Sequence, residues 1–273
     1  THRSMAAVLK RLGFYAAEET AVGATIVKKR YDEMAEKREK DVIISSCCHS
    51  VNLLIQKHYP AALPYVAKVV SPMQAHSLDI KRRDPEAKTV FIGPCISKKA
   101  EAEMYPGTVD CVLTFEELSE WFAEAGIDQE DVVDKEIDSE RKDEGRARLF
   151  PTSGGILRSM EKRQKEYTYI GVDGQKNSIP ALEDIVSGKL SKCFIEMSAC
   201  AGSCIGGPVM DRSNRATLMD YAAVDHFAGK KDFSVADYSA DRLEKEIGYI
   251  GLHRQLPGSS VIEEILHKMG KMT

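Results

Sequence analysis

Short apolar runs separated by helical patterns occupy the first half of the chain. Each run is rich in valine and isoleucine and is bounded by turn residues, which is typical of a buried parallel strand. The four runs are DVIISS (41–46), AKVVS (67–71), KTVFIGP (88–94) and DCVLTF (110–115). Since strands that alternate with helices build parallel sheets, residues 41 to about 126 are predicted to form one α/β lobe.

The same alternation returns after residue 150 and predicts a second lobe. Its strands are YTYIGV (167–172) and KCFIEMS (192–198), and a glycine-led helical pattern precedes them. Residues 1–40 carry two helical patterns and are assigned to this lobe together with residues 150–210. The charged residues 127–149 between the lobes are expected to be an exposed excursion.

Residues 211–273 are predicted to form a helical tail, with patterns near 214–228, 238–248 and 259–270. The expected fold class is therefore α/β, with two parallel-sheet lobes in a single core that spans residues 1–273. In open parallel sheets, sites form beyond the carboxyl ends of the strands. The cleft between the two lobes is thus the expected place for chemistry.

Charge and cysteine usage narrow the class of protein. The net charge of -4 offers no electrostatic reason to bind nucleic acid or an anionic membrane. No apolar run approaches the roughly 18 residues of a membrane span, and the charged opening stretch does not resemble a signal peptide. Seven cysteines, an odd number, argue against a disulfide framework and for the reducing cytoplasm, where clustered thiols are metal ligands or catalytic groups.

Five of the seven cysteines directly follow predicted strands. Cys47 and Cys48 come after VIISS, Cys95 comes after VFIGP, and Cys200 and Cys204 come after FIEMS. All five therefore lie on loops at the carboxyl ends of strands, where a site is expected. The helix starts that follow would favour their thiolate forms.

Four thiolates around small residues match the needs of an iron–sulfur cubane, which requires close approach of the backbone. The loops GPC and SACAGSCIGG are nearly all small. A Cys₄ zinc site is the alternative, although structural zinc usually employs CxxC pairs and this chain has none. A third interpretation is incidental buried cysteines, and this is the one favoured for Cys111 and Cys193, which lie inside predicted strands.

Five motifs, in order, carry a resemblance that covers residues 40 to 210. They are SSCCHSVNLLIQKHYP, GPCISKKAEAE, VDCVLTFEELSEWF, FPTSGGILRSM and EMSACAGSCIGGP. They resemble the successive motifs of the [FeFe]-hydrogenase large-subunit core, TSCCP, PCxxKKxE, DxVLTxxEL, a xxxGG helix start and ExMxCxxGCxxGGG. The resemblance implies two α/β lobes with a six-iron H-cluster between them.

The resemblance also implies roles for individual residues. The ligands of the [4Fe-4S] part would be Cys48, Cys95, Cys200 and Cys204, and Cys204 would also bridge to the binuclear iron unit. Cys47 would pass protons to the open iron, since the ordinary pKa of a free thiol lies near the working pH. Lys98 would donate a hydrogen bond to an iron-bound cyanide. Small residues that would lie near the cofactor are Gly93, Ser153, Gly154, Gly155 and Ser198.

Departures from the family pattern surround the expected active iron. Gly93 and Ser198 replace methionines, Met73 replaces a glutamine, and His49 replaces a proline. The family's proton wire uses two glutamates and a serine, and the matching positions here hold Lys29, Asp32 and Ala67. A lysine relays protons at neutral pH only if its pKa is strongly depressed. All four ligand cysteines are kept, whereas the residues of the proton wire are replaced. This combination resembles the divergent sensory branch of the family.

The expected function is therefore hydrogen sensing or slow reversible hydrogen turnover. The alternatives are a fully catalytic [FeFe]-hydrogenase, an iron–sulfur assembly scaffold and a zinc-stabilised interaction domain. Expected partners are H₂ and protons, an electron-transfer partner or adjoining iron–sulfur modules, and a signalling partner. The chain is expected to be a fragment, because a family segment that binds the second cyanide has no counterpart in it. The binuclear unit would then require that upstream segment.

Overall fold

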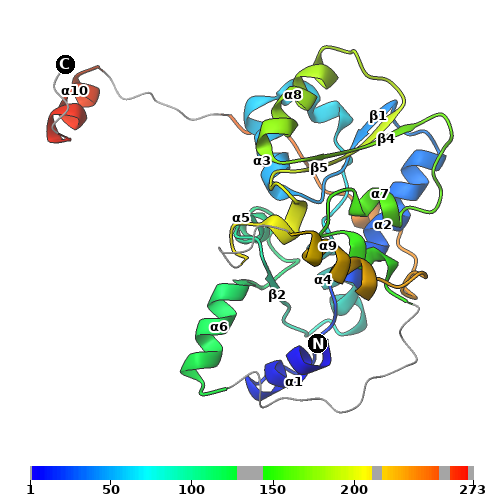
Figure 1. Ribbon diagram of the computed structural model, residues 1–273, viewed down its shortest axis with the longest axis vertical. Helices are drawn as coiled ribbons and strands as arrows, with labels where there is room; N and C mark the ends of the chain where they lie inside the picture. Colours follow the sequence, from blue (N-terminus) through cyan, green and yellow to red (C-terminus); the bar gives the residue numbers. More distant parts are fainter. Residues whose placement is uncertain (1, 128–143, 211–216, 252–258, 270–273) are drawn as a thin grey trace.

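The computed structural model describes residues 2–127, 144–210, 217–251 and 259–269. Five short strands form two separate parallel sheets (Figure 1). The strands are β1 (Val42–Ile44), β2 (Val90–Gly93), β3 (Cys111–Thr114), β4 (Thr168–Asp173) and β5 (Cys193–Ser198). The larger sheet has the order β1-β5-β4, and the smaller one pairs β2 with β3. The predicted α/β class with two parallel sheets is confirmed.

Helices connect the strands and cover the sheets. In the described ranges they are α1 (His2–Arg11), α2 (Ala21–Glu36), α3 (His49–His58), α4 (Pro72–Arg83), α5 (Ser97–Met104), α6 (Phe115–Glu124), α7 (Gly155–Ser159), α8 (Gln175–Val186), α9 (Leu218–Phe227) and α10 (Ser259–Lys268). Short 3-10 helices add η1 (Pro60–Tyr65), η3 (Arg146–Leu149), η4 (Ser203–Gly206) and η5 (Ala240–Leu243). No helix in the described parts has the length and apolar character needed to cross a bilayer.

The strands β1 and β5 of the larger sheet are buried on both faces, whereas the edge strand β4 is partly exposed. Successive side chains of a strand point to opposite faces. Ile43 and Phe194 pack against α2 and α7 on one face, whereas Ile44 and Ile195 pack against α3 and α8 on the other. Figure 1 shows these helix pairs on either side of the sheet. The apolar run of β1 and the apolar first half of β5 are therefore as expected for a doubly covered parallel sheet.

The smaller sheet belongs to a second packed unit in the lower part of Figure 1. Helix α6 starts with a capping box in which the Thr114 side chain accepts from the Glu117 amide and the Glu117 carboxylate accepts from the Thr114 amide. This box satisfies two amides that the first turn leaves unpaired. Leu118 and Phe122 on α6 pack against Val8 of α1.

The grouping of residues 41–126 into one lobe needs a correction at its first strand. Strand β1 pairs with β5, with Ile43 opposite Phe194, and not with β2. Helix α1 needs the opposite correction, because it packs on α6 and not with the larger sheet. Helix α2 does join the larger sheet, as predicted. Apolar periodicity identifies strands and helix faces but carries no information on their partners, which explains both errors.

Two expected elements are replaced by irregular structure. The predicted strand 67–71 forms only an isolated bridge, Val69 to Glu244, because Ser71 already caps α4. The predicted helix 238–248 contains only η5, and the extended residues after it pack Ile247 into the core. The charged excursion 127–149 lies largely outside the described residues.

Candidate functional site

The cysteine loops of β1 and β5 leave the larger sheet side by side. The Ser45 amide donates to the Ile195 carbonyl at 2.9 Å, and the Met197 amide donates to Ser45 Oγ at 3.1 Å. Beyond these bonds lies Cys48, the N-cap residue of α3, where burial raises the pKa of the thiol and the backbone amide of Ala199 opposes that rise. The parallel pairing of β1 with β5 thus brings Cys48 to the loop that carries Cys200.

The turn that carries Cys204 also touches the loop after β2. A Cβ added at Gly207 would lie 3.0 Å from the Pro94 carbonyl oxygen, so only glycine allows this approach. The turn itself needs a left-handed residue at Gly202, whose φ is 81°. Pro94 directly precedes Cys95, so the two sheets meet where their cysteine loops meet.

The four predicted ligand thiols are electrostatically coupled. The protein packed around Cys204, together with the charges of Cys48, Cys95 and Cys200, raises its pKa to about 12, although part of the residue is exposed to solvent. Burial also raises the pKa of Cys200, again with contributions from Cys48 and Cys95. No three His, Cys, Asp or Glu side chains in the described ranges are grouped closely enough to hold one metal ion.

Cys47 is half-buried and packs against a tyrosine from α2. The Tyr31 hydroxyl lies 3.2 Å from Cys47 Sγ and accepts from the Ser46 amide at 2.9 Å. Burial raises the pKa of the Cys47 thiol to about 12, although the Tyr31 bond and the charge of Lys98 oppose this. The expectation that this pKa lies near the working pH is therefore wrong, since desolvation outweighs the favourable contacts. At neutral pH Cys47 is a protonated thiol.

Lys98 is held on the same side of the site by a buried carboxylate. Its Nζ donates to the Cys47 carbonyl at 3.1 Å and to Glu101 Oε2. Burial alone would lower the pKa of Lys98, but the charge of Glu101 and the hydrogen bond to it, together with smaller contributions from Cys95 and Cys47, raise that pKa overall. Lys245, from the C-terminal segment, donates to Glu101 Oε1 at 2.8 Å. Burial would raise the pKa of Glu101, yet the two lysines lower it to about 2.

Sequence reasoning missed Tyr31, Glu101 and Lys245. Glu101 could have been found, because it is the last position of the PCxxKKxE-like motif in GPCISKKAE. Tyr31 and Lys245 have no local signal, since they lie 16 and about 200 residues from Cys47 along the chain. His49 is also buried here, and both its ring nitrogens lack a hydrogen-bond partner among the described residues. Burial lowers the pKa of His49 to about 4.

The glycine-led helix is tied to β5 through a buried glutamate. The Leu157 amide donates to Glu196 Oε2 at 3.0 Å, and the amides of Gly154, Gly155 and Ile156 also point to this carboxylate. Burial raises the pKa of Glu196 to about 7 in spite of these bonds. The Ile205 amide donates to the Pro151 carbonyl at 3.1 Å, which places Ser153 and its neighbours beside the Cys204 turn.

Two of the substituted positions are filled by packing. Gly93 ends β2, and a Cβ there would lie 2.7 Å from the Phe91 ring, so the larger side chain of the family's methionine has no room. Met73 is buried with Phe91 and Val112. Ser198 is buried at the end of β5, where its carbonyl accepts from the Gly174 amide at 3.0 Å.

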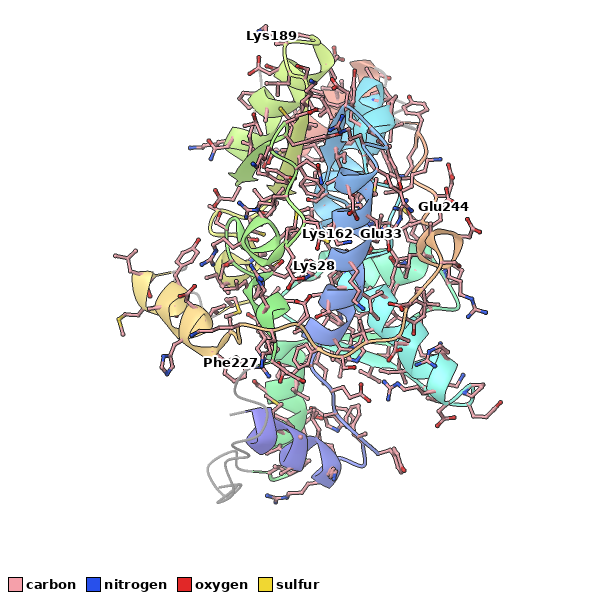
Figure 2. The ribbon with its side chains drawn as sticks, turned by 90° about the vertical axis from the view of Figure 1, so that its right-hand side faces the viewer. Lys28, Glu33, Lys162, Lys189, Phe227 and Glu244 are labelled. Atoms are coloured by element: carbon pink, nitrogen blue, oxygen red, sulfur yellow. The ribbon has the colours of Figure 1, made fainter. Side chains whose placement is uncertain are left out.

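Lys29 and Asp32, which match positions of the family's proton wire, make their contacts with other residues and not with Cys47. Lys29 is 41% exposed and pairs with Asp237 at 3.3 Å. Asp32 is buried, and burial raises its pKa, with Lys28 Nζ 3.8 Å away. Lys28 lies midway along α2 and also pairs with Asp232 (Figure 2). Tyr31, between these residues, is the α2 side chain that contacts the thiol.

The two remaining cysteines differ from each other. Cys193 is buried at the start of β5, as expected for a small core residue. Cys111 is exposed at the start of β3, so its predicted burial is wrong. The two-stranded sheet leaves the first residue of β3 uncovered, whereas β5 is the central strand of the larger sheet.

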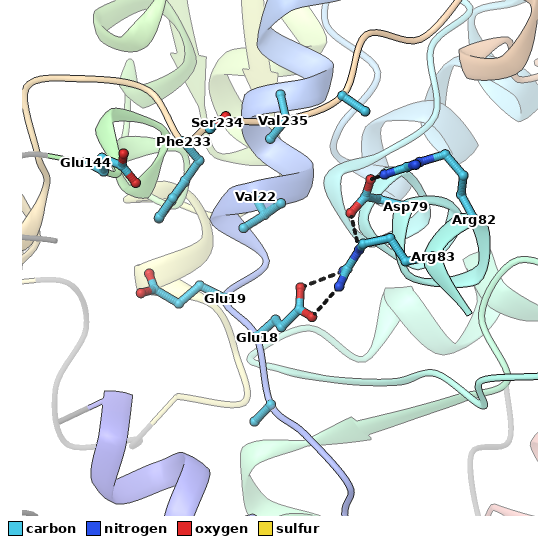
Figure 3. Close-up of a pocket in the computed structure, with 12 residues that line it drawn as sticks. Glu18, Glu19, Val22, Asp79, Arg82, Arg83, Glu144, Phe233, Ser234 and Val235 are labelled. Atoms are coloured by element: carbon cyan, nitrogen blue, oxygen red, sulfur yellow. Dashed lines mark hydrogen bonds and ion pairs between the residues drawn. The ribbon is translucent and has the colours of Figure 1, made fainter. Parts of the chain in front are cut away.

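One cavity in the described residues is lined by none of the cysteines. It has a volume of about 490 Å³ and is bounded by the start of α2, the end of α4 and residues 233–236 (Figure 3). Its charges are already paired: Arg83 binds Glu18 at 2.8 Å and Asp79 at 2.9 Å. Because no cysteine lines this cavity, the chemistry belongs to the thiol site and not to this hollow.

The fold and the coupled thiols define an α/β domain with a cysteine-lined site between two parallel sheets. The chain belongs to the family described as iron only hydrogenase large subunit, C-terminal domain, whose model matches residues 1–208.

Individual relatives agree with this membership. The chain is 26% identical to the periplasmic [Fe] hydrogenase large subunit of Nitratidesulfovibrio vulgaris, covering 82% of this chain and 68% of that protein. It is 29% identical to the cytosolic Fe-S cluster assembly factor NAR1 of Eremothecium gossypii, covering 43% of this chain and 28% of that protein. The fold resembles an apo variant of [FeFe]-hydrogenase HydA1 from Chlamydomonas reinhardtii, with a TM-score of 0.61, 19% identity, and coverage of 97% and 83% of the two chains.

Proposed function

We propose that this chain is an H-cluster-type core that binds a [4Fe-4S] cluster through Cys48, Cys95, Cys200 and Cys204. The observation that carries the proposal is the convergence of the loops that hold these four cysteines, where β1 pairs with β5 and Gly207 approaches Pro94. A cubane has four irons and four sulfides and therefore holds its thiolates further apart than a single ion does.

The donor set fits this cofactor on its own chemistry. Several thiols on converging loops ionise together only if cations neutralise them, and iron supplies that charge. Lys98 adds a positive charge on the same side, with 12% of its side chain exposed. Among the small residues expected near the cofactor, Gly154 has open space where a Cβ would lie, which leaves room for the cofactor and its sulfides.

When bound, a binuclear iron unit would supply hydrogen binding and redox chemistry. Toward it, Cys47 holds a proton on Sγ, where the Tyr31 hydroxyl orients the thiol at 3.2 Å. Lys98 Nζ offers a hydrogen bond to a cyanide of that unit, and Glu101 keeps it charged. Burial excludes water from this side of the site, which strengthens both interactions.

We infer sensing or slow turnover in preference to rapid catalysis. The supporting observation is that Lys29 faces solvent while Tyr31 takes the place beside Cys47. A tyrosine with a pKa well above its ordinary value is a poor acid and base at neutral pH. Electron-transfer and signalling partners, adjoining iron–sulfur modules and a cytoplasmic location belong to this proposal.

A second candidate is an iron–sulfur assembly scaffold. The observation in its favour is the 29% identity to an assembly factor. A scaffold needs the cubane ligands but has no use for a buried thiol and ammonium aimed at a further iron unit. Cys47 and Lys98 therefore favour the hydrogenase-type core.

Infrared spectroscopy tests the proposal. The protein, purified without oxygen, is supplied with iron, sulfide and a synthetic binuclear precursor, and spectra are recorded under argon and then under hydrogen. Sharp CO and CN bands that shift reversibly with hydrogen are the expected result. Bound iron without such bands would favour the scaffold, and a chain that binds no cluster would refute both. A turnover rate equal to that of high-flux relatives would contradict the sensing role.

A further inference from the structure

Lys245 reaches the thiol site from the far end of the chain. The segment after η5 runs antiparallel to residues 68–70: the Lys245 amide donates to the Lys68 carbonyl at 3.2 Å, and the Val70 amide donates to the Leu243 carbonyl at 2.9 Å. Glu244, the residue before Lys245, is labelled on this segment in Figure 2. These two hydrogen bonds fix the orientation of the segment, so that the Lys245 side chain points into the protein.

The ammonium of Lys245 is almost completely buried, with 1% of its side chain exposed. It donates to Glu101 Oε1 at 2.8 Å, while Lys98 occupies Oε2 of the same carboxylate. Lys245 also lies over the Tyr105 ring, 5.4 Å from its centroid, and this contact favours a cation. Glu101 is fully buried and uses both oxygens on lysines.

The group of Lys98, Glu101 and Lys245 carries one more positive than negative charge. A buried excess charge is costly unless an opposite charge lies nearby. Besides Glu101, the contacts of this group are with the cysteine loops: Lys98 Nζ donates to the Cys47 carbonyl at 3.1 Å, and the Lys98 amide donates to the Cys95 carbonyl at 3.2 Å. The excess charge therefore faces the cysteine loops.

We propose that Lys245 is a positioning residue of the cluster site, which fixes Glu101 and through it Lys98, and which adds a second buried positive charge beside the cysteine loops. The part that concerns the cluster rests on the proposed function. The part that concerns the ion group stands on the described contacts alone.

The charge has a consequence for reduction of a bound cluster. Reduction adds one electron, taken from dithionite in the experiment, and no proton or ligand needs to leave. The reduced cluster is more negative by one charge, so a nearby ammonium stabilises it more than the oxidised form. Removing that ammonium should make reduction less favourable.

The first experiment is a redox titration of the reconstituted full chain, followed by electron paramagnetic resonance. Lys245→Met is expected to weaken reduction about tenfold, which is about 59 mV for one electron. Lys245→Arg, which keeps the charge, should stay within a factor of about two of the unchanged protein. Lys68→Met is the matched control, because Lys68 is 46% exposed and lies on the neighbouring strand segment. A cluster that loads normally but has the same potential in Lys245→Met and Lys68→Met overturns the proposal.

The second experiment needs no cluster and uses urea unfolding of the metal-free chain. In the unchanged background, Lys245→Met leaves one Glu101 oxygen unpaired and should lower the folding constant about tenfold. In a Glu101→Gln background, Lys245 is an unneutralised ammonium beside Lys98, so the same change should raise the folding constant. Equal effects of Lys245→Met in both backgrounds overturn the proposal. If no cluster forms in any variant, the proposed function fails. In that case the difference between the two backgrounds in the urea experiment still decides whether Lys245 fixes Glu101 and Lys98.

Discussion

The Tyr31 hydroxyl lies 3.2 Å from the sulfur of Cys47 and accepts a hydrogen bond from the Ser46 amide at 2.9 Å. Tyr31 is fully buried on α2, and Ser46 and Cys47 lie on the loop after β1. One phenol thus fixes both the backbone of the cysteine loop and the orientation of its thiol. The position of Cys47 depends on α2 as much as on its own strand.

Substituting Tyr31→Phe should therefore destabilise the protein. The change leaves the buried Ser46 amide without its acceptor, and an unsatisfied buried donor costs about 1–3 kcal/mol. Urea unfolding of the metal-free protein measures this loss. Tyr15→Phe is the control, because Tyr15 is 97% exposed and should change the free energy of unfolding by less than about 0.5 kcal/mol. If the two variants had equal free energies of unfolding, the Tyr31 hydroxyl would make no contribution to stability.

Stability should fall as pH rises through the range set by Glu196. Its pKa is raised from 4.5 to about 7 in the folded state, so folding takes up a proton between these values. The contribution is fully present below about pH 4.5 and is lost as pH passes about 7, and its full size is about 3 kcal/mol.

The difference between Glu196→Gln and the unchanged protein isolates this contribution. The amide cannot ionise, so the variant should lose the decline between pH 5 and pH 8 and gain stability relative to the unchanged protein at the upper end. Urea unfolding at several pH values measures both curves. Glu103→Gln, at an exposed position of α5, should keep the original slope. If the stability curves of Glu196→Gln and of the unchanged protein ran parallel over this pH range, the pH dependence would come from a group other than Glu196.

Serine substitutions should separate ligand cysteines from the others. After anaerobic reconstitution, the unchanged chain should hold about four irons and four sulfides. Replacing any one of Cys48, Cys95, Cys200 or Cys204 by serine should remove most of this iron, measured together with sulfide. Cys47→Ser should retain the cubane, because Cys47 is predicted to act on protons. Cys111→Ser is the surface control, and iron loss there as large as at Cys95 would refute the ligand assignment.

Gly155→Ala should destabilise the loop that packs on Glu196. An added Cβ would lie 1.8 Å from the Leu149 carbonyl oxygen, and this backbone atom cannot rotate away as a flexible side chain could. Overpacking of this kind costs about 1–3 kcal/mol or more. Gly248→Ala is the matched control, since its nearest neighbour is a glutamate side-chain oxygen at 3.7 Å. Thermal unfolding of both variants gives the comparison, and equal melting temperatures would contradict the close approach.

Sequence patterns predicted the parts of the site that depend on local structure. The strands that end before Cys47, Cys95 and Cys200 could be read from apolar runs, because a run that ends in turn residues marks a strand end wherever its partner lies. The start of α6 could be read from Thr114 and Glu117, which form a capping box within one turn. The five motifs and their order predicted the protein family, and the match to the family model confirms that prediction.

The sequence by itself thus determined the α/β class and the positions of the cysteines just beyond strand ends. Only the tertiary structure decided that β1 pairs with β5, that Tyr31 meets Cys47, and that Lys245 meets Glu101 across 144 residues of chain. The physical reason is that strand ends and caps are fixed by neighbours a few residues away. Pairing and buried ion contacts depend instead on which surfaces fit together, and a single sequence has no local pattern that records that fit.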